Sequence, residues 1–333
     1  MVPKDMYSHS KSPLVAVTGA NGYIGSRVCS ALQSAGIAIR PIVRSYGFKL
    51  FDNTVESVVV GDLASGPMWN EAIRGVDHII HTAGMVHKVE TKSEESAAEY
   101  FRINRDATLS LASEAIKQDV KKFLFFSSIA VYGPLKNDVQ AVESMHCKPI
   151  GHYANSKFAA ERGLLDIASE TSIELAILRP PMVHGPDCPG NLVRLAKLLK
   201  YDVPLPFGAL KSRRNLIGID NLCDFVVKLI TDERNISGIW NVADREDVDL
   251  PDILNSLGLG MGKHPKLISV PAASLNVLAT LLGQRKAVEK LTSSMLVNSS
   301  AAQKRFGWVA PVTARDGLRK AGQSFAVSAS VER

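Results

Sequence analysis

The segment LVAVTGANGYIGSRVCSAL, from Leu14 to Leu32, joins an apolar run to a helical pattern through a glycine-rich loop. The run LVAV is typical of a buried strand in a parallel sheet. The loop carries three glycines with GxxGxxG spacing, namely Gly19, Gly22 and Gly25. Between a strand and a helix, such glycines permit a tight turn, close approach of the backbone to a pyrophosphate, and helix–strand packing. The helix then begins near Tyr23 and Ile24 with N–H groups that favour an anion. We therefore predict a dinucleotide-binding site that includes these five residues.

Short apolar runs alternate with helical patterns through the first half of the chain. This order predicts an α/β fold, a Rossmann doubly wound parallel sheet over residues 13–180. After Pro181 the pattern breaks into shorter pieces punctuated by Pro and Gly. We expect a smaller C-terminal lobe over residues 181–325, with a segment around 215–242 returning to the first domain.

The composition indicates a soluble globular protein, with 46% hydrophobic and 22% charged residues among 333. The net charge of +6 is scattered along the chain, so we expect no nucleic-acid arm, and an anionic small ligand explains the charge better. The four cysteines lack metal or disulfide spacing and indicate reduced thiols in the cytoplasm. No metal site is expected. No apolar run reaches 18 residues, so we expect no membrane insertion, and the apolar stretch Ala273–Gly283 is interpreted as a core helix.

The second strand candidate lies in GIAIRPIVRS, from Gly36 to Ser45. Strands at this position often end in an acid that binds a ribose 2′-hydroxyl, whereas an arginine accommodates a 2′-phosphate. Here Arg44 and Ser45 end the strand, and no Asp or Glu occurs from Ile37 to Leu50. This favours NADP(H), with NAD(H) as the alternative.

Two further strand ends supply candidate cofactor contacts. The first ends in Asp62 and Leu63, where the carboxylate either accepts from an adenine amino group or caps a helix. The second ends in small residues that let a cofactor approach the backbone: Thr82, Ala83 and Gly84. His81, just before them, is interpreted as a core histidine rather than a catalytic one.

The segment FLFFSSIAVYG is a strand that ends in Ser127 and Ser128, and YANSK follows later in the chain. In YANSK, Tyr153 and Lys157 are four residues apart and share one face of a helix. The ammonium is expected to lower the pKa of the phenol and bring it into a useful acid–base range. With Ser128 bonded to the reacting oxygen, the set predicts hydride transfer at a carbonyl or carbinol. The nicotinamide would carry the hydride, and Tyr153 the proton.

Together TGANGYIG, SSIAVYG, YANSK and LRPPMVHGP resemble the extended short-chain dehydrogenase/reductases, in their nucleotide-sugar epimerase, dehydratase and reductase branch. The resemblance runs from about Leu14 to beyond Trp308. It implies a catalytic triad of Ser128, Tyr153 and Lys157, in which Ser128 and Tyr153 contact the substrate and Tyr153 and Lys157 the cofactor. It also implies further residues on the cofactor side: Asn104, which is either structural or a cofactor contact, Ser127, Pro180 and Met182.

The same resemblance implies that the second lobe binds a nucleotide-diphosphate sugar, with a UDP-sugar expected. Asn191 stands at a helix start where the family contacts the sugar diphosphate. Arg214, with Arg213 beside it, matches an arginine that reaches the diphosphate, a role that suits a bidentate guanidinium. A solvated basic loop is the alternative. The resemblance also implies a homodimer formed through two helices of the first domain.

Three functions remain open. Dehydratases of this branch place an acidic pair after the strand-end Ser or Thr, whereas Ile129 and Ala130 follow Ser128 here. We favour an NADP(H)-dependent reductase of a 4-keto nucleotide sugar. The best match is reduction of UDP-4-keto-6-deoxy-GlcNAc to UDP-N-acetylquinovosamine for lipopolysaccharide or O-antigen biosynthesis. The alternatives are a UDP-hexose or UDP-GlcNAc 4-epimerase that retains NAD, and a non-catalytic NADP-sensing scaffold.

Overall fold

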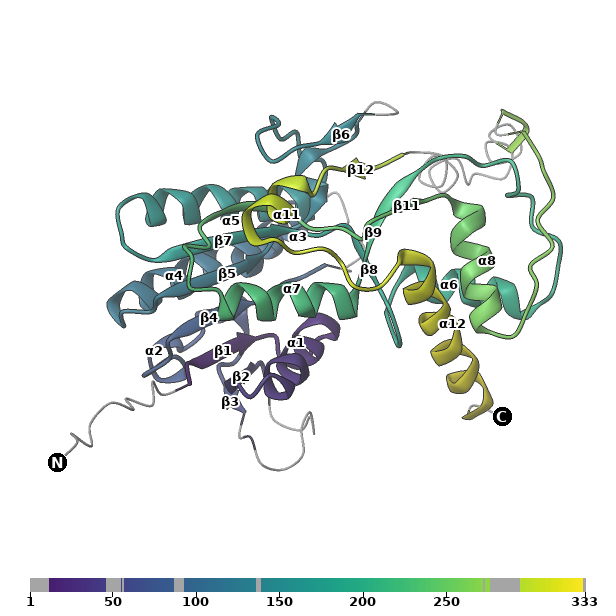
Figure 1. Cartoon of the computed structure of the whole chain (residues 1–333). Helices are drawn as coiled ribbons and strands as arrows, with labels where there is room; N and C mark the ends of the chain where they lie inside the picture. Colours follow the sequence, from purple (N-terminus) through teal and green to yellow (C-terminus); the bar gives the residue numbers. More distant parts are fainter. Residues whose placement is uncertain are drawn as a thin grey trace.

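A computed structural model describes residues 12–45, 55, 57–86, 93–135, 139–271, 273–275 and 294–331. Its larger body is a parallel sheet flanked by helices, and a smaller lobe carries helices α6, α8 and α12 (Figure 1). The predicted apolar helix Ala273–Gly283 lies mostly outside the described residues.

The large sheet has seven strands in the order β10-β7-β5-β4-β1-β2-β3, all paired in parallel. In chain order they are β1 (Leu14–Thr18), β2 (Ala38–Val43), β3 (Val58–Val59), β4 (His78–His81), β5 (Lys122–Phe126), β7 (Glu174–Arg179) and β10 (Gly238–Asn241). The chain moves outward from β1 to β3 and then returns to build the other half from β4. The strand order therefore reverses between β1 and β4, where open α/β sheets bind ligands. The predicted doubly wound fold is confirmed.

Helices cover both faces of this sheet because successive strand residues point to opposite sides. Val15 and Val17 pack on one face with α1 (Tyr23–Ser34), α7 (Ile219–Thr231) and α11 (Ser300–Phe306). Ala16 faces the other side, which is covered by α2 (Trp69–Ala72), α4 (Ala107–Lys117) and α5 (His152–Ser169). The two apolar cores hold the carboxyl ends of the strands at one edge.

A π-helical segment lies within the helix that the sequence predicts over residues 100–118. The chain forms α3 (Glu94–Phe101), a π-helical segment η2 (Arg102–Asp106) and then α4. The buried side chain of Asn104 lies in η2, where it bonds the backbone of Met85 through Oδ1 at 2.7 Å and Nδ2 at 3.0 Å. A π-helical turn of this kind commonly marks a functional position.

The smaller lobe is built on a three-stranded sheet in the order β11-β9-β8. Its elements are β8 (Met182–His184), α6 (Asn191–Lys200), β9 (Arg214–Gly218), β11 (Asp247–Val248), α8 (Leu250–Gly260) and α12 (Ala314–Val331). Between β9 and β11 the chain returns to the large sheet, where it forms α7 and β10. A small pair joins β6 (Gln140–Ala141) to β12 (Leu296–Val297), and two short 3₁₀ turns are η1 (Leu63–Ser65) and η3 (Ile129–Tyr132). The domain boundary at residue 180 stays a prediction.

The four cysteines are buried free thiols: Cys29, Cys147, Cys188 and Cys223. Within the described part of the chain, no helix has both the length and the apolar character needed to cross a membrane. The same residues contain no group of three or more His, Cys, Asp or Glu placed to hold a metal ion.

Asp244 links elements of both bodies through a buried carboxylate. It accepts hydrogen bonds from the backbone of Gly218 at 3.0 and 3.1 Å, from Asn221 at 2.6 Å and from His184 at 2.8 Å. Gly218 caps α7 of the large body, and His184 belongs to β8 of the small lobe. The carboxylate therefore fixes the point where β8, β9 and α7 meet.

We expect Asp244→Ala to lower the free energy of unfolding by about 3 kcal/mol, because it leaves several buried donors without an acceptor. Urea unfolding measures this change. The matched control is Asp220→Ala, which removes an exposed partner of Lys320 and should cost about 0.5 kcal/mol or less. Equal losses in the two variants would contradict the role given to Asp244.

Candidate active site

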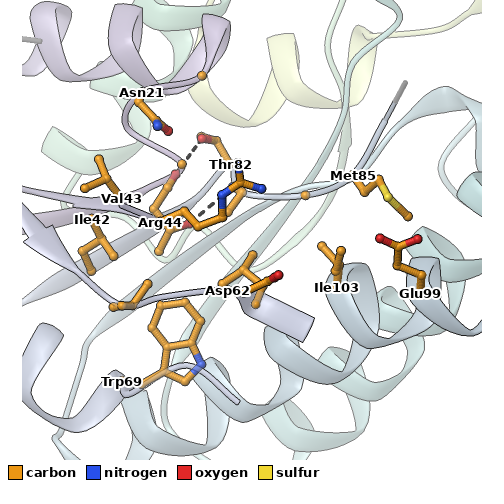
Figure 2. Close-up of a pocket in the computed structure, with 17 residues that line it drawn as sticks. Asn21, Ile42, Val43, Arg44, Asp62, Trp69, Thr82, Met85, Glu99 and Ile103 are labelled. Atoms are coloured by element: carbon orange, nitrogen blue, oxygen red, sulfur yellow. Dashed lines mark hydrogen bonds between the residues drawn. The ribbon is translucent and has the colours of Figure 1, made fainter. Parts of the chain in front are cut away.

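A cavity of about 570 Å³ lies at the carboxyl ends of β1, β2 and β4. Among its lining residues are predicted cofactor contacts from separate parts of the chain: Gly19, Gly22, Arg44, Asp62, Leu63, Thr82, Ala83 and Gly84. Figure 2 shows Trp69 and Ile42 near Arg44 at one end of the cavity, and Met85, Ile103 and Glu99 at the other. The cavity is lined by polar and apolar groups in similar measure, which suits a dinucleotide, whose phosphates and riboses are polar and whose rings are flat.

The glycine loop beside this cavity turns so tightly that it leaves no room for side chains. Gly19 has φ +66°, and the Gly22 N–H donates to the Gly19 carbonyl at 2.8 Å. A Cβ added at Gly25 would lie 2.2 Å from that same carbonyl oxygen. Helix α1 begins directly after this turn, with Tyr23 and Ile24 as its first residues, as the sequence predicts. Their binding of a pyrophosphate stays a prediction.

Arg44 directly follows β2 and is exposed at the cavity, with Ser45 exposed after it. Arg40, on the same strand, turns elsewhere and donates to the carbonyls of Ala72 and Arg74. Arg44 is thus the arginine of this strand that reaches the cavity.

Asp62 fills one of the two roles that the sequence left open and lies where it could fill the other. Its carboxylate accepts from the Ala64 N–H at 3.0 Å and caps η1. It also lines the cavity, with Leu63 beside it. The cap is observed, and the adenine contact stays a prediction.

The loop after β4 lies against β1 without bulky side chains. Thr82 Oγ1 donates to the Thr18 carbonyl at 2.7 Å, and Ala83 and Gly84 continue the cavity wall. Asn104 holds the next residue, Met85, so its observed role is structural. His81 is buried, with Thr18 Oγ1 at 2.7 Å from Nδ1 and Thr108 Oγ1 at 2.9 Å from Nε2. Its interpretation as a core histidine is confirmed, and burial lowers its pKa to about 3.

Ser128 is bonded to Tyr153, and Lys157, four residues after Tyr153 on α5, lies beside Gly84 of the cavity wall. Ser128 follows β5 and bonds the Tyr153 phenol, while its Oγ accepts from the Ala130 N–H at 3.2 Å. A Cβ at Gly84 would lie only 3.4 Å from Lys157 Nζ. Lys157 therefore borders the cavity at Gly84, and the contact of Ser128 and Tyr153 with a ligand stays a prediction.

Lys157 is buried, and its ammonium lies 4.5 Å from the centroid of the Phe125 ring. Burial lowers the pKa of Lys157 from 10.5 to about 7, although the nearby charge of Glu161 opposes that shift. The expectation that Lys157 lowers the pKa of Tyr153 is wrong for this structure. Burial of the Tyr153 phenol raises its pKa, against the hydrogen bond with Ser128.

A buried charged group behind Lys157 was not predicted from the sequence. Glu161 makes a bidentate pair with Arg179, with Oε1–Nε at 3.0 Å and Oε2–Nη2 at 2.5 Å. Ser127 Oγ donates to the same carboxylate, so its observed partner is Glu161. The spacing of Lys157 and Glu161, four residues apart on α5, is the sequence signal that could have indicated this group.

Pro180 and Met182 flank the turn from β7 to β8, and the Pro180 carbonyl accepts from Ile129 N–H at 3.1 Å. They follow the strand next to Ser128, but the structure does not place them among the residues that line the described cavity. Their contact with the nicotinamide stays a prediction.

The predicted substrate contacts lie in the smaller lobe. Asn191 is exposed at the first position of α6, after Gly190. Arg213 is exposed and paired with Asp247. Arg214 is half-buried at the start of β9, donates to Ser212 Oγ at 3.3 Å, and has a pKa lowered by burial. Arg213 therefore already has an acidic partner, and the substrate role of all three residues stays a prediction.

The chain is similar in sequence to one family and to several known proteins. The sequence model described as NAD dependent epimerase/dehydratase family matches residues 15–243. A UDP-glucose 4-epimerase of Vibrio cholerae is 28% identical over 319 residues, 93% of this chain and 95% of that protein. A ceramide reductase of Caulobacter vibrioides is 28% identical over 262 residues, 78% of this chain and 74% of that protein.

Solved structures show the same fold. A mutant UDP-glucuronic acid 4-epimerase from Bacillus cereus, in complex with UDP-4-deoxy-4-fluoro-glucuronic acid and NAD, matches with a TM-score of 0.76. It is 23% identical, and the match covers 95% of this chain and 99% of that chain.

Burial of Lys157 predicts a pH dependence of stability. Between pH 7 and 10.5 the unfolded lysine holds a proton that the folded lysine has released, so the free energy of unfolding rises with pH. We expect a rise of about 1 kcal/mol from pH 7 to 8 that Lys157→Met removes. Denaturant unfolding at each pH measures it, and the surface variant Lys197→Met is the control. The same rise in Lys157→Met as in the natural chain would refute this explanation.

Proposed function

Because the chain belongs to the NAD dependent epimerase/dehydratase family, we propose that it transfers hydride at a carbon of a nucleotide-diphosphate sugar. The observation that carries this proposal is that Lys157 borders the cavity at Gly84, with Tyr153, which is bonded to Ser128, four residues before it on α5. A dinucleotide lying along the cavity would present its nicotinamide at that end. When bound, the dinucleotide supplies or accepts the hydride.

We propose the direction of reduction, with NADPH as the consumed cofactor. Arg44 reaches the cavity from the end of β2, and β2 carries no acidic residue. A guanidinium there can bind a 2′-phosphate, which a carboxylate would repel. The acids of the cavity wall, Asp62 and Glu99, come from other elements.

The state of Tyr153 is compatible with this direction. Ketone reduction needs an acid that gives a proton to the carbonyl oxygen as hydride reaches the carbon. Since burial raises the pKa of Tyr153, its phenol starts the cycle protonated. The Ser128 hydroxyl, already bonded to that phenol, would hold the same oxygen. The phenolate formed would regain its proton before the next turnover.

We propose a 4-keto UDP-sugar as substrate, with UDP-4-keto-6-deoxy-GlcNAc as the best candidate and UDP-N-acetylquinovosamine as product. Ile129 and Ala130 after Ser128 provide no acid or base for loss of water. Arg214 and Asn191 are the proposed diphosphate contacts, and synthesis of surface polysaccharide in the cytoplasm is the proposed setting. A homodimer through α4 and α5 is also proposed, although among their described residues only Leu165 is a strongly exposed large apolar side chain.

On similarity alone, a 4-epimerase that retains NAD fits this chain as well as the proposed reductase does. The Vibrio cholerae relative is a UDP-glucose 4-epimerase, and the Bacillus cereus structure contains NAD. The Caulobacter relative, by contrast, is a reductase. A non-catalytic scaffold is the third possibility, and the assembled Ser128–Tyr153 pair argues against it.

When the protein is mixed with NADPH and the 4-keto sugar, the absorbance of the reduced nicotinamide should fall as NADPH is oxidised, and the 4-hydroxy sugar should form. Tyr153→Phe should lower kcat by about 100-fold or more while dinucleotide binding persists. Interconversion of UDP-GlcNAc and UDP-GalNAc without added cofactor would instead support the epimerase. Unchanged biological function in Tyr153→Phe would support the scaffold.

Arg44→Asp should shift the preference, measured as the ratio of kcat/KM for NADPH and NADH, towards NADH by about tenfold or more. The exchange removes a charge-assisted bond to the 2′-phosphate and introduces repulsion. Arg74→Asp is the control, because that exposed arginine pairs with Glu71 outside the cavity lining. An unaltered ratio in Arg44→Asp would remove the support for NADP(H).

A further inference from the structure

The solvent face of α6 combines cationic and large apolar side chains. Leu192, Ala196 and Leu199 form its buried face in the core of the smaller lobe. The opposite face carries Arg194, Lys197, Leu198 and, one residue beyond the helix, Tyr201, at a spacing that places them on one side. The solvent face of α6 thus presents cations and apolar side chains together, while its own apolar face is used for the core of the lobe.

The apolar part of this surface extends beyond α6 to a neighbouring segment. The exposed fractions are 75% for Tyr201, 52% for Ile268, 49% for Val203 and 40% for Leu198, and we name these four residues the α6 patch. Backbone bonds join the two segments, from Leu205 N–H to the Lys266 carbonyl and from Ile268 N–H to the Leu205 carbonyl, each at 2.8 Å. A further bond of 2.8 Å runs from Lys263 Nζ to the Lys200 carbonyl. The patch therefore spans two segments that are fixed to each other.

The charge around the patch is strongly positive. Residues 190–208 and 261–270 contain five basic side chains, Arg194, Lys197, Lys200, Lys263 and Lys266, and one acidic side chain, Asp202. Asp202 is itself paired with Lys266. The excess of four charges compares with +6 for all 333 residues, so much of the net charge gathers at this edge.

We propose that the α6 patch and its basic rim bind the surface of an anionic lipid bilayer. Lysine and arginine are attracted to anionic headgroups, and their long stems can lie beside inserted apolar side chains. Tyrosine favours the membrane–water interface. Nucleic acid would use the cations but leave the apolar side chains exposed, and a second copy would bring five cations against five. The bilayer is the partner that satisfies both parts of the surface.

This surface is separate from the dinucleotide cavity. The cavity is lined by residues of the first domain, whereas α6 and the segment around Ile268 belong to the smaller lobe, away from the large sheet (Figure 1). Bilayer binding therefore does not depend on the proposed reaction. It would hold the enzyme at a membrane face with its catalytic residues outside the lipid.

The test is co-sedimentation of the full chain with vesicles of phosphatidylcholine alone and with vesicles about one-third phosphatidylglycerol. We expect binding to the anionic vesicles only, and its loss at about 0.5 M salt, where screening shortens the range of the charges. Lys197→Gln with Lys200→Gln should lower the partition coefficient by about 30-fold, from about 1 kcal/mol for each lysine. Tyr201→Ser with Ile268→Ser should lower it at least several-fold.

Met68→Ser is the matched control, because Met68 is 74% exposed but lies next to α2 in the first domain. It should bind vesicles like the natural chain, and all variants should keep the thermal stability of the natural chain. The proposal fails if the natural chain stays in solution with anionic vesicles, or if both double variants bind as it does. It also fails if Tyr201→Ser with Ile268→Ser changes only the oligomeric state in sedimentation velocity, which would assign the patch to a second copy.

Discussion

The side-chain amine of Lys157 lies buried in the candidate active site, and the surrounding structure offsets only part of the cost of that burial, since its pKa is still lowered to about 7. Desolvation of an isolated charge is expensive, so a buried lysine needs partners or loses its proton. The Phe125 ring and Glu161 supply favourable interactions, and Arg179 and Ser127 fix the carboxylate of Glu161. Four elements, β5, its carboxyl-terminal turn, α5 and β7, are thereby tied together around one side chain.

The candidate catalytic residues lie on these same elements, and Lys157 borders the cavity. Ser128 follows β5, Tyr153 opens α5, and Gly84 ends the wall of the cavity that starts at the glycine loop. Because parallel strands end at one edge, residues distant in sequence converge without long loops. Burial raises the pKa of Tyr153, so its phenol holds a proton that ketone reduction would use. Arg44 at the far end suits a cofactor that is consumed and replaced.

Local patterns in the sequence were sufficient to predict the strand–loop–helix unit and the parallel sheet. They were also sufficient to select Ser128, Tyr153 and Lys157 as one candidate set. Each depends on spacing along the chain that geometry converts into proximity. The Glu161–Arg179 pair, the Asn104–Met85 bonds and the Asp244 junction were missed because each joins separate segments of the chain. The effect of Lys157 on Tyr153 was predicted wrongly because burial, a tertiary property, outweighs spacing.

The central claim is that hydride passes from a consumed nicotinamide to the sugar while Tyr153 supplies the proton. Transfer of deuterium from NADPH labelled at the transferable position tests it most directly, with the sugar product examined by mass spectrometry. The account predicts one deuterium per product molecule at the carbon that carried the carbonyl. A product without label, formed while the added cofactor stays reduced, would contradict it.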